Sequence, residues 1–485
     1  MELIRAAAAD LEEAAALYQR AEQAMKEEDP EGGYEEIGPS AETLRAETAA
    51  GHLYIQRENG ALAAAVALAP QQDPEYIGIG WTYGVQPGVI RYLAVDPGAR
   101  KSGLGGGVMD DALQLLRGMG CDCVRCDTDA RNGRAVRLLE KMGFRECGEF
   151  RREGCVHPFR GFDKPLKRET PLLPIRMTPA FRGGKLTPWG GEKLKTVWGK
   201  DLREIPTGES LEVSCIPGLE SRDPLGRTLT ELIREFGEKI AGRYADKPFP
   251  LLLKLIDARE ALSVQVHPND AYAAEKEGGK LGKTEAWLIL DTPPGGGELV
   301  YGIKPGTTLG ALREASREGK AVEKLLRRVR VQAGDVCYIP AGCVHAIGAG
   351  ITLYEIQQSS DITYRFYDWD RTDSEGRRRE LHLEKGLDVT DLKLLPMPVR
   401  VEKAYGGKRI LKEQYFMLDV IRTDDSGVLP PIHDFGMMTV LEGQITLRWK
   451  NGRMKMRKGE TCFLPRSLPE VTLRGKGAAA VSMPG

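Results

Sequence analysis

The feature that most constrains this chain is a series of short apolar runs in its middle part, each bounded by glycine, proline or aspartate. The runs are LLLKLI, ALSVQVH, EAWLIL, DVCYIP and ITLYEIQQ. Runs of this length between turn residues are typical of strands, and many of them in succession predict a sandwich or a barrel. The middle of the chain is therefore expected to be mostly β.

The chain is too long for one ordinary core. It has 485 residues, whereas single hydrophobic cores stop growing at roughly 250–300 residues. The best linker is the Pro-rich and charged segment RETPLLPIRMTPAFRGGKLTP, with a boundary near Glu169. From about Val401 the sequence is again strand-like, which predicts a second small barrel. The expected domains are residues 1–168, 169–400 and 401–485.

Helical and turn patterns complete the expected architecture. The opening, Leu3 to Met25, is helical, and Asn59-Gly60 between apolar alternations predicts a hairpin. The strand VIRYLAVD then leads into a glycine-rich loop and a helix. Further helices are expected over Thr228 to Tyr244 and over ALREASREGKAVEKLLRRV. The fold class is an α+β N-terminal domain followed by mostly-β domains with helical insertions.

Composition excludes several classes of partner. The 69 Lys and Arg nearly balance the 70 Asp and Glu, for a net charge of -1, so no nucleic-acid partner is expected. There is neither a secretory signal pattern nor the roughly 18–20 apolar residues of a membrane helix. We therefore expect a cytoplasmic protein with no membrane partner that acts on a small molecule.

The nine cysteines are scattered, which fits a reducing compartment. Cys121, Cys123 and Cys126 lie close together in CDCVRC, and a zinc site is one interpretation of this run. No second Cys/His pair follows nearby, and the run alternates like a strand. Buried small hydrophobes are the favoured interpretation.

Four polar residues in the β region form a metal-ligand pattern. Gln265 and His267, in SVQVHPND, are two apart on an expected strand, so both point to one face. Glu285 enters another strand in GKTEAWLIL, and His345 lies at a turn in YIPAGCVHAIGAG. Each histidine alone is more simply a hydrogen-bonded residue at a strand end, but the joint arrangement favours a metal site.

This ligand set has a chemical consequence. Two neutral imidazoles, an amide oxygen and one carboxylate leave a divalent ion with net positive charge and with room for water or substrate oxygens. Such an ion is a Lewis acid, unlike the closed four-ligand arrangement of a structural zinc.

At these residues the sequence closely resembles the type I phosphomannose isomerase family, a zinc-dependent branch of the cupin superfamily. The resemblance runs from about Leu173 to Gly485 and includes FPLLLKLIDAREALSVQVHPND, GKTEAWLIL, AGCVHAIGAG and EIQQSSDITYRFYDWDR. It implies two cupin barrels, with Zn2+ held in the first. The family's zinc ligands match Gln265, His267, Glu285 and His345.

The same resemblance implies catalytic residues and a reaction. Active-site basic residues match Lys254, Lys283 and Arg365, and a looser match places Trp189 and Glu209 in the pocket. The implied reaction interconverts mannose 6-phosphate and fructose 6-phosphate by proton transfer between C2 and C1 through an enediol. The implied partner is thus a sugar phosphate.

The individual roles stay open at this point. Arg365 is suited to enediolate or phosphate oxygens, although it could instead form an ion pair with Asp361 or Asp368. Lys254 or Lys283 could serve as the proton shuttle if its pKa is lowered, or both could bind phosphate. The second barrel retains only His433 and is expected to be a structural partner.

The N-terminal part carries a second pattern. In ARKSGLGGG, glycines after a strand and before a helix would let backbone N–H groups approach a pyrophosphate. In DARNGRAVRLLEKMGFRECG, Asn132 opens a helix that ends at Gly143. Together these motifs resemble the GNAT acetyltransferase family over about residues 1–166, which implies acetyl-CoA binding. The implied cofactor-binding residues are Arg100, Lys101, Gly103, Leu104, Gly105, Gly106 and Asn132.

One departure bears on the transfer step. Many family members have a tyrosine, acting as general acid to the leaving thiolate, where this chain has Leu139. Either another residue protonates the thiolate or the domain binds CoA without efficient transfer. The acceptor stays open among amino sugars, a small amine and a protein N-terminus.

The leading hypothesis is a fusion of an acetyltransferase-like domain with a phosphomannose isomerase. One rival is a sugar-phosphate sensor that regulates the acetyltransferase, and another is an iron-dependent cupin oxygenase. The complete ligand set with its basic residues argues against the sensor, and phosphate-suited surroundings argue against the oxygenase.

Overall fold

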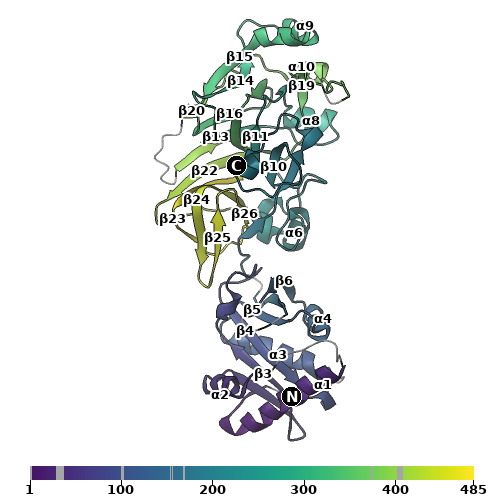
Figure 1. Ribbon diagram of the computed structural model, residues 1–485, viewed down its shortest axis with the longest axis vertical. Coiled ribbons are helices and arrows are strands. Elements are labelled where there is room, and N and C mark those ends of the chain that lie inside the picture. The colour runs from purple at the N-terminus through teal and green to yellow at the C-terminus, as the bar shows by residue number, and fades with distance from the viewer. Residues whose placement is uncertain are drawn as a thin grey trace. The chain divides into compact units, whose positions relative to one another are not determined.

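The computed structural model describes residues 3–28, 38–99, 103–152, 155, 157–167, 170–372, 375–400 and 408–485 (Figure 1). The chain divides into two compact units. One contains Met1–Leu173, Arg448–Met454 and Ser467–Glu470, and the other contains Pro174–Leu447, Lys455–Arg466 and Val471–Gly485. Within the described ranges, no helix combines the length and the apolar character that crossing a membrane requires.

The N-terminal unit is built on a seven-stranded sheet with helices on both faces. In spatial order its strands are β1 (Ile4–Arg5), β2 (Leu53–Glu58), β3 (Ala61–Ala69), β4 (Pro87–Val95), β5 (Cys123–Asp129), β7 (Phe159–Pro165) and β6 (Arg145–Phe150). Its helices are α1 (Leu11–Glu28), α2 (Ala41–Ala49), α3 (Leu104–Gly118) and α4 (Gly133–Lys141), with 3-10 turns η1 (Ala8–Asp10), η2 (Pro74–Tyr76) and η3 (Pro97–Ala99).

The first expected helix begins later than the sequence pattern indicated. Ile4 pairs with Ile55 on β2, so the chain starts as an edge strand before α1. The hairpin prediction is confirmed, because β2 and β3 are joined by Asn59 and Gly60 with φ of 51° and 86°. Both values suit the tight turns that favour Asn-Gly.

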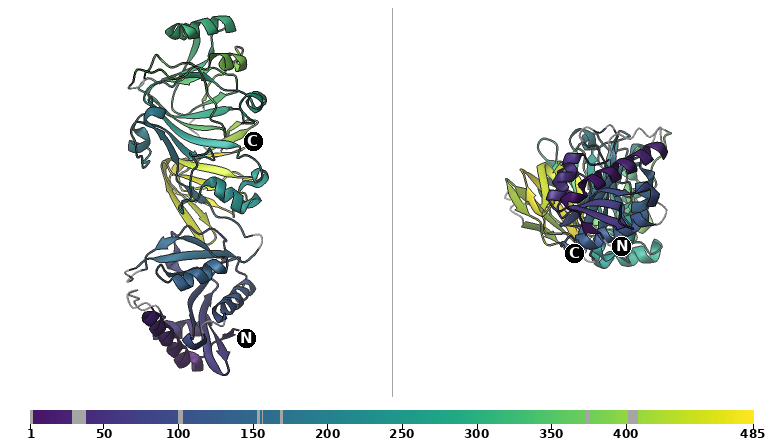
Figure 2. Two further views of the ribbon diagram at one scale, coloured as in Figure 1. Left: turned by 90° about the vertical axis from the view of Figure 1, so that its right-hand side faces the viewer. Right: turned by 90° about the horizontal axis from the view of Figure 1, so that it is seen from below.

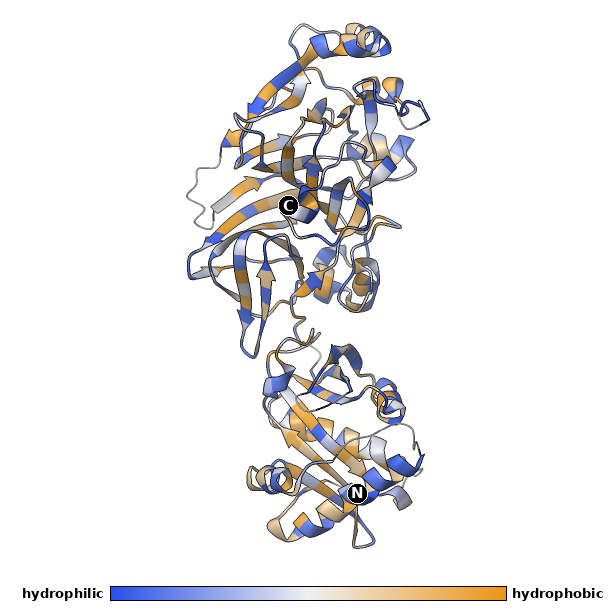
Figure 3. Cartoon of the chain, in the orientation of Figure 1, coloured by the Kyte–Doolittle hydropathy of each residue, from blue (hydrophilic) through white to orange (hydrophobic). Residues whose placement is uncertain are grey.

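The parallel pair β4 and β5 is short. The two strands are in register only from Pro87 opposite Cys123 to Val89 opposite Arg125, although both continue beyond that point. Apolar residues of this sheet pack against α3 and α4 on one face and against α1 and α2 on the other, and Figure 3 shows the apolar colouring along its strands.

The first barrel of the C-terminal unit is formed by two sheets that share one apolar core. In spatial order, one sheet contains β20 (Val399–Arg400), β16 (Asp335–Ile339), β13 (Glu285–Asp291), β18 (Ile351–Gln358), β11 (Leu251–Ala258), β10 (Thr207–Val213) and β9 (Ala180–Gly183). The other contains β15 (Leu326–Val331), β14 (Gly297–Ile303), β17 (His345–Ile347), β12 (Val264–Val266) and β19 (Tyr364–Tyr367). Trp287 of the first sheet and Tyr301 of the second belong to the same buried cluster.

Short helices connect these strands. They are α5 (Lys193–Thr196), α6 (Leu229–Phe236), α7 (Glu238–Ala241), α8 (Asp270–Lys276), α9 (Leu309–Arg317) and α10 (Leu383–Val389), with 3-10 segments η4 (Gly184–Leu186), η5 (Gly242–Tyr244) and η6 (Gly319–Leu325). Thr228 starts α6, where a helix was expected to begin, and forms a capping box with Glu231. The expected helix then breaks at Gly237 and Gly242, which have φ of 52° and 56°.

The second expected helical insertion is only partly helical. The helix α9 ends at Arg317 and is followed by Gly319, whose φ of 68° lies in the left-handed region. The stretch Leu326–Val331 is strand β15, paired with β14. Along it Arg328 and Arg330 are exposed, whereas Arg327, Val329 and Val331 are partly or fully buried, which is the period of two of a strand.

The second barrel completes the C-terminal unit, and its yellow strands lie next to the first barrel in Figures 1 and 2. It contains β21 (Lys408–Lys412), β22 (Phe416–Thr423), β28 (Gly477–Pro484), β24 (Gly436–Trp449), β26 (Thr461–Leu464) and β8 (Ile175–Met177), with β23 (Ser426–Val428), β25 (Gly452–Arg457) and β27 (Thr472–Arg474) at its side. The strand β8 comes from the start of this unit and pairs with β26. The predicted mostly-β architecture with helical insertions is thus confirmed.

Candidate metal centre and active-site pocket

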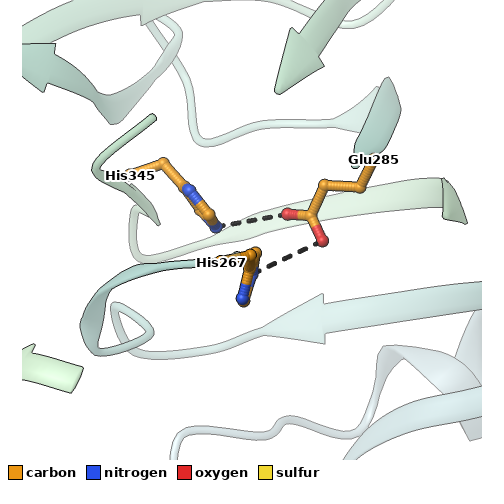
Figure 4. Close-up of side chains that lie close together, drawn as sticks. All are labelled: His267, Glu285 and His345. Atoms are coloured by element: carbon orange, nitrogen blue, oxygen red, sulfur yellow. Dashed lines mark ion pairs between the residues drawn. The ribbon is translucent and has the colours of Figure 1, made fainter. Parts of the chain in front are cut away.

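Three of the predicted metal ligands meet in the first barrel. His267, Glu285 and His345 are all buried, and each has a donor atom within 4.8 Å of the other two (Figure 4). The Gln265 amide lies 3.3 Å from His345 Nε2. A rotation of this amide by half a turn would place its oxygen where its nitrogen now lies, so it can face the same point. Across the described ranges, no other group of three His, Cys, Asp or Glu side chains is this compact.

Strand register explains how these residues meet. Gln265 on β12 lies opposite His345 on β17 and opposite Arg365 on β19. Residues paired across neighbouring strands project from the same face of a sheet. Glu285 begins β13 in the other sheet, so the site lies between the two sheets. His267 follows the end of the three-residue strand β12, rather than sharing the strand with Gln265 as expected.

Hydrogen bonds and burial leave these ligands in the protonation states that a metal requires. His345 Nδ1 lies 2.9 Å from the carbonyl oxygen of Cys343 and can donate to it, which directs the Nε2 lone pair toward Glu285. Burial, and then the charge of Lys283, hold the pKa of His267 well below its ordinary value. The imidazole is therefore neutral.

The Glu285 carboxylate is the anionic member of the set. Burial would raise its pKa, but the positive charge of Lys283 outweighs burial and holds the pKa well below its ordinary value. Its Oε1 lies 3.2 Å from His345 Nε2, and its Oε2 lies 3.7 Å from His267 Nε2 and 3.0 Å from Lys283 Nζ. Two imidazole nitrogens and a carboxylate that converge in a buried site fit a divalent cation, because these are the donor groups that such ions bind in proteins.

A pocket of about 100 Å³ opens beside these ligands. Seven of the site residues predicted from the sequence line it, whereas His267 and His345 do not: the seven are Trp189, Glu209, Lys254, Lys283, Gln265, Glu285 and Arg365. It is also lined by polar residues that the sequence reasoning missed: Arg182, Glu355, Ser360, Asp361, Thr363 and Arg379. Glu355, Ser360, Asp361 and Thr363 lie in the same stretch of sequence as Arg365, whereas the fold brings in Arg182 and Arg379 from other segments.

Four side chains that line the pocket form a chain of ion pairs with alternating charge. Lys254 Nζ lies 3.3 Å from Glu209 and 3.2 Å from Glu355, and Arg182 lies 3.4 Å from Glu209. Trp287 Nε1 donates to Glu355 at 2.9 Å. Burial lowers the pKa of Lys254, but the two glutamates outweigh it and the pKa is raised overall. Lys254 is therefore protonated, as an ammonium ion. Glu355 could have been predicted from the sequence, because it is the only charged residue in the run ITLYEIQQ.

Arg365 does not form the ion pair that the sequence left open. Asp361 pairs with Lys280 at 2.9 Å, and Asp368 pairs with Arg371 and Arg379 at 2.5 Å each. Among the residues that the structure describes, no carboxylate lies within ion-pair distance of Arg365. Its guanidinium lines the pocket instead.

The N-terminal unit shows its predicted cofactor residues in part. Arg100 and Lys101 lie outside the described residues. Gly103, with φ of 80°, precedes α3, and Leu104, Gly105 and Gly106 form its first turn. A Cβ added at Gly106 would meet nothing within 4 Å, so this helix N-terminus has the open surface that a pyrophosphate requires.

Four other residues singled out in this unit make contacts within the fold. The Asn132 side chain caps α4 by accepting from Ala135 N at 3.0 Å. Leu139 is buried in the apolar core. Cys123 and Cys126 are buried on and beside apolar neighbours, and burial raises the pKa of both thiols well above its ordinary value. All three cysteines of this run, Cys121 included, are buried, as expected for small hydrophobic residues.

The two barrels, with buried His and Glu ligands in the first, define a metal-binding cupin-like enzyme. Residues 218–284 match the family model for the catalytic domain of type I phosphomannose isomerase, and residues 408–484 match the cupin domain of mannose-6-phosphate isomerase. Residues 14–144 match the acetyltransferase (GNAT) family.

Full-length relatives extend this similarity. The mannose-6-phosphate isomerase ManA of Bacillus subtilis is 39% identical over 317 residues, covering 64% of this chain and 98% of the relative. The Streptococcus mutans mannose-6-phosphate isomerase is 35% identical over 58% of this chain and 89% of its own length. A crystal structure of the Bacillus subtilis mannose 6-phosphate isomerase aligns with a TM-score of 0.59 and 33% identity, covering 64% of this chain and 99% of that one. The chain therefore belongs to the type I phosphomannose isomerase family and carries an additional N-terminal GNAT domain.

Proposed function

We propose that the C-terminal unit interconverts mannose 6-phosphate and fructose 6-phosphate with a zinc ion held by Gln265, His267, Glu285 and His345. The observation that carries this proposal is the buried group of His267, Glu285 and His345, because Glu285 also lines a pocket that contains Lys254, Lys283 and Arg365. The names of the relatives, both mannose-6-phosphate isomerases, support the choice of substrate.

Each basic residue of the pocket has its own role in the proposed isomerisation. When bound, zinc would polarise the substrate carbonyl as a Lewis acid. Arg365 lies on the strand next to Gln265 and donates hydrogen bonds to oxygens that become negative in the enediolate. Lys254, held as an ammonium by two glutamates, stabilises negative charge or gives up a proton rather than starting as a base. Lys283 lies beside the ligands, 3.0 Å from Glu285, and is the other candidate for proton transfer.

For the N-terminal unit we propose acetyl-CoA binding at the start of α3, followed by transfer to an amine. The open glycine turn at Gly103 to Gly106 supports binding. The sensor hypothesis for the cupin half is less favoured, because a sensor has no need of Lys254, Lys283 and Arg365 beside a complete ligand set.

A coupled assay for mannose 6-phosphate turnover tests the isomerase. The wild type should lose activity with a chelator and regain it with added zinc. His345→Ala should lose both bound metal and activity, since a tetradentate site reduced to three ligands binds zinc weakly. Turnover that persists without metal, or no turnover in a folded and zinc-loaded wild type, would refute the proposal.

The acetyl-CoA proposal has a separate test. Calorimetric titration with acetyl-CoA should give saturable binding of about one molecule per chain in the wild type. Gly106→Val fills the open side of the α3 turn and should weaken binding at least tenfold, while Gly118→Ala near the C-terminal end of α3 should not. An absence of binding heat and of any thermal shift in the wild type would end this assignment.

A further inference from the structure

Two of the proposed metal ligands lie on segments that pack tightly against each other. His267 is followed by the sequence PND, and Glu285 is preceded by the sequence GKT. Lys283 N donates to the carbonyl oxygen of Pro268 at 2.9 Å. A Cβ added at Gly282 would lie 2.8 Å from the same oxygen, so the two backbones meet where only glycine leaves enough room. The positions of both ligands therefore depend on how these two segments are held together.

The carboxylate of Asp270 joins the two segments. It belongs to the PND segment, and its Oδ1 accepts from Gly282 N of the GKT segment at 2.8 Å. The same oxygen accepts from Gln358 Nε2 at 2.8 Å, and Gln358 Oε1 accepts from Thr284 N at 2.9 Å. The carboxylate thus holds the GKT segment at its first residue and, through the glutamine, at the residue before Glu285.

The other oxygen of this carboxylate is held by the second barrel. Tyr415 lies between β21 and β22, and its hydroxyl donates to Asp270 Oδ2 at 2.8 Å. In the part of the chain that the structure describes, Oδ2 has no second donor. The ring of the next residue, Phe416, meets Tyr338 of β16 edge-on, with 6.5 Å between centroids. The hairpin that carries Tyr415 is therefore packed against the first barrel.

Asp270 is in this way the meeting point of three separate parts of the chain. Its side-chain donors come from the GKT segment, from strand β18 and from the second barrel. Hydrogen bonds to a carboxylate are charge-assisted and stronger than those between neutral groups. The carboxylate is only partly buried, so loss of the Tyr415 donor would let it rotate toward water and weaken its bond to Gly282.

We propose that the Tyr415 hydroxyl is a positioning group for the metal centre: through Asp270 it holds together the segments that carry His267 and Glu285. This inference rests on the proposed zinc site. The second barrel contributes no ligand, and it supports the ligand-bearing segments from outside the site. Partners bonded directly to metal ligands commonly change affinity by about 10- to 100-fold. Tyr415 acts through one further residue, so its effect should be smaller.

The test compares Tyr415→Phe with Tyr354→Phe, because each change removes one hydroxyl that joins the two barrels. The Tyr354 hydroxyl lies 2.7 Å from Ser482 Oγ, and both residues are fully buried. Among the described residues it bonds to neither ligand-bearing segment. Zinc affinity is measured by competition with a chromogenic chelator. Tyr415→Phe should weaken zinc binding by about three- to tenfold, whereas Tyr354→Phe should stay within about twofold of the wild type.

Hydrogen exchange on the zinc-free protein measures the positioning role without the metal. The amides of Gly282 and Thr284 donate the hydrogen bonds that depend on Asp270 and Gln358. Tyr415→Phe should speed exchange in the peptide 280–285 by about fivefold or more, because these bonds open more often. Tyr354→Phe should leave that rate unchanged. Raising the zinc concentration should restore most of the turnover of Tyr415→Phe in the coupled assay.

Three results would overturn the inference. Unchanged zinc affinity in Tyr415→Phe would show that the hydroxyl does not position the ligands. Unchanged exchange in the peptide 280–285 would show that the hydroxyl does not hold the two segments together. Equal losses of zinc affinity and of thermal midpoint in Tyr415→Phe and Tyr354→Phe would make both hydroxyls merely structural links between the barrels.

Failure of the proposed function remains distinguishable. A wild type that binds no zinc, or that does not turn over mannose 6-phosphate when zinc-loaded, contradicts the function and not the link between the barrels. The exchange measurement needs neither metal nor substrate. Faster exchange in Tyr415→Phe alone supports the link even then, and equal rates in the two variants contradict it.

Discussion

The two barrels of the C-terminal unit are both built from antiparallel strand pairs, yet they bury different chemistry. The first barrel buries Lys254, Glu285, His345 and Glu355 between its sheets. The second buries aromatic and aliphatic side chains, and its Phe435 and Phe463 rings stack at 5.3 Å. Buried charges are costly unless they are paired or bind a ligand. The difference therefore identifies the first barrel as the one built to hold an ion and a substrate.

The polar residues that the second barrel does bury have ordinary hydrogen-bonding roles. Thr461 donates to Glu212 of the first barrel at 2.6 Å, and Thr439 lies 2.9 Å from Thr461. Its one histidine, His433, is exposed. A shared architecture thus supports a reactive site in one barrel and a packed support in the other, so function depends on the side chains and not on the fold alone.

The largest effect should come from a change in the ligand set of the first barrel. Glu285→Gln removes the charged ligand from a buried site. We expect bound zinc to fall from one per chain to near zero and turnover to fall by at least about 1000-fold. His433→Ala in the second barrel should change neither quantity. Metal analysis of purified protein and the coupled assay give both numbers.

Either of two results would contradict the assignment of metal binding to the first barrel alone. Retention of zinc in Glu285→Gln would place the ion elsewhere. A loss of zinc in His433→Ala would show that the second barrel also contributes to metal binding.

Two buried lysines provide the next test. Lys254 lies between Glu209 and Glu355 in the pocket, whereas Lys200 lies 2.5 Å from Glu212 at the junction of the barrels. Replacing either by methionine leaves a buried glutamate without its cation and should lower the free energy of unfolding by about 3–5 kcal/mol. Only Lys254→Met should also lower kcat, by about 100-fold.

The stability loss in Lys254→Met should depend on pH. Burial already raises the pKa of Glu355 despite the nearby lysine, and losing that lysine raises it further. A carboxyl whose folded-state pKa is raised contributes stability that is present below its unfolded value and lost as pH rises. The deficit should therefore be smaller at about pH 5 than at about pH 7 in urea unfolding. An equal deficit at both pH values would show that Glu355 is not left unpaired. A normal kcat would remove Lys254 from the chemistry.

The sequence was sufficient for the mostly-β architecture, because this depends on local patterns, and it named His267, Glu285 and His345, which the fold brings together. Alternating runs between turn residues predicted the strands, and the Asn59-Gly60 pair predicted a hairpin. The helix expected over 311–329 was wrong at its end, because the residues from Leu326 to Val331 pair with β14 as strand β15.

The pocket required the register between strands, which a single sequence does not reveal. Arg182 faces Glu209 only because β9 pairs with β10. Arg379 reaches the pocket only through Asp368, eleven residues earlier in the chain. Glu355 was missed although one charged residue in an apolar strand is a recognisable signal. Long-range pairing, rather than composition, decides which charges meet.

The smallest effect should come from the hydroxyl that joins the two barrels. Thr461→Val removes one donor to Glu212, which keeps Lys200 and the Ser210 hydroxyl at 2.5 and 2.6 Å. The Glu212 carboxylate therefore still has two partners, and the free energy of unfolding should fall by only about 1–2 kcal/mol. Thr439→Val, which breaks only the bond between the two threonines, should cost less. Zinc content and kcat should stay at wild-type values in both, because Glu212 does not line the pocket. A fall in kcat without a fall in stability would show that this junction acts on the site of the first barrel, and the second barrel would then be more than a packed support.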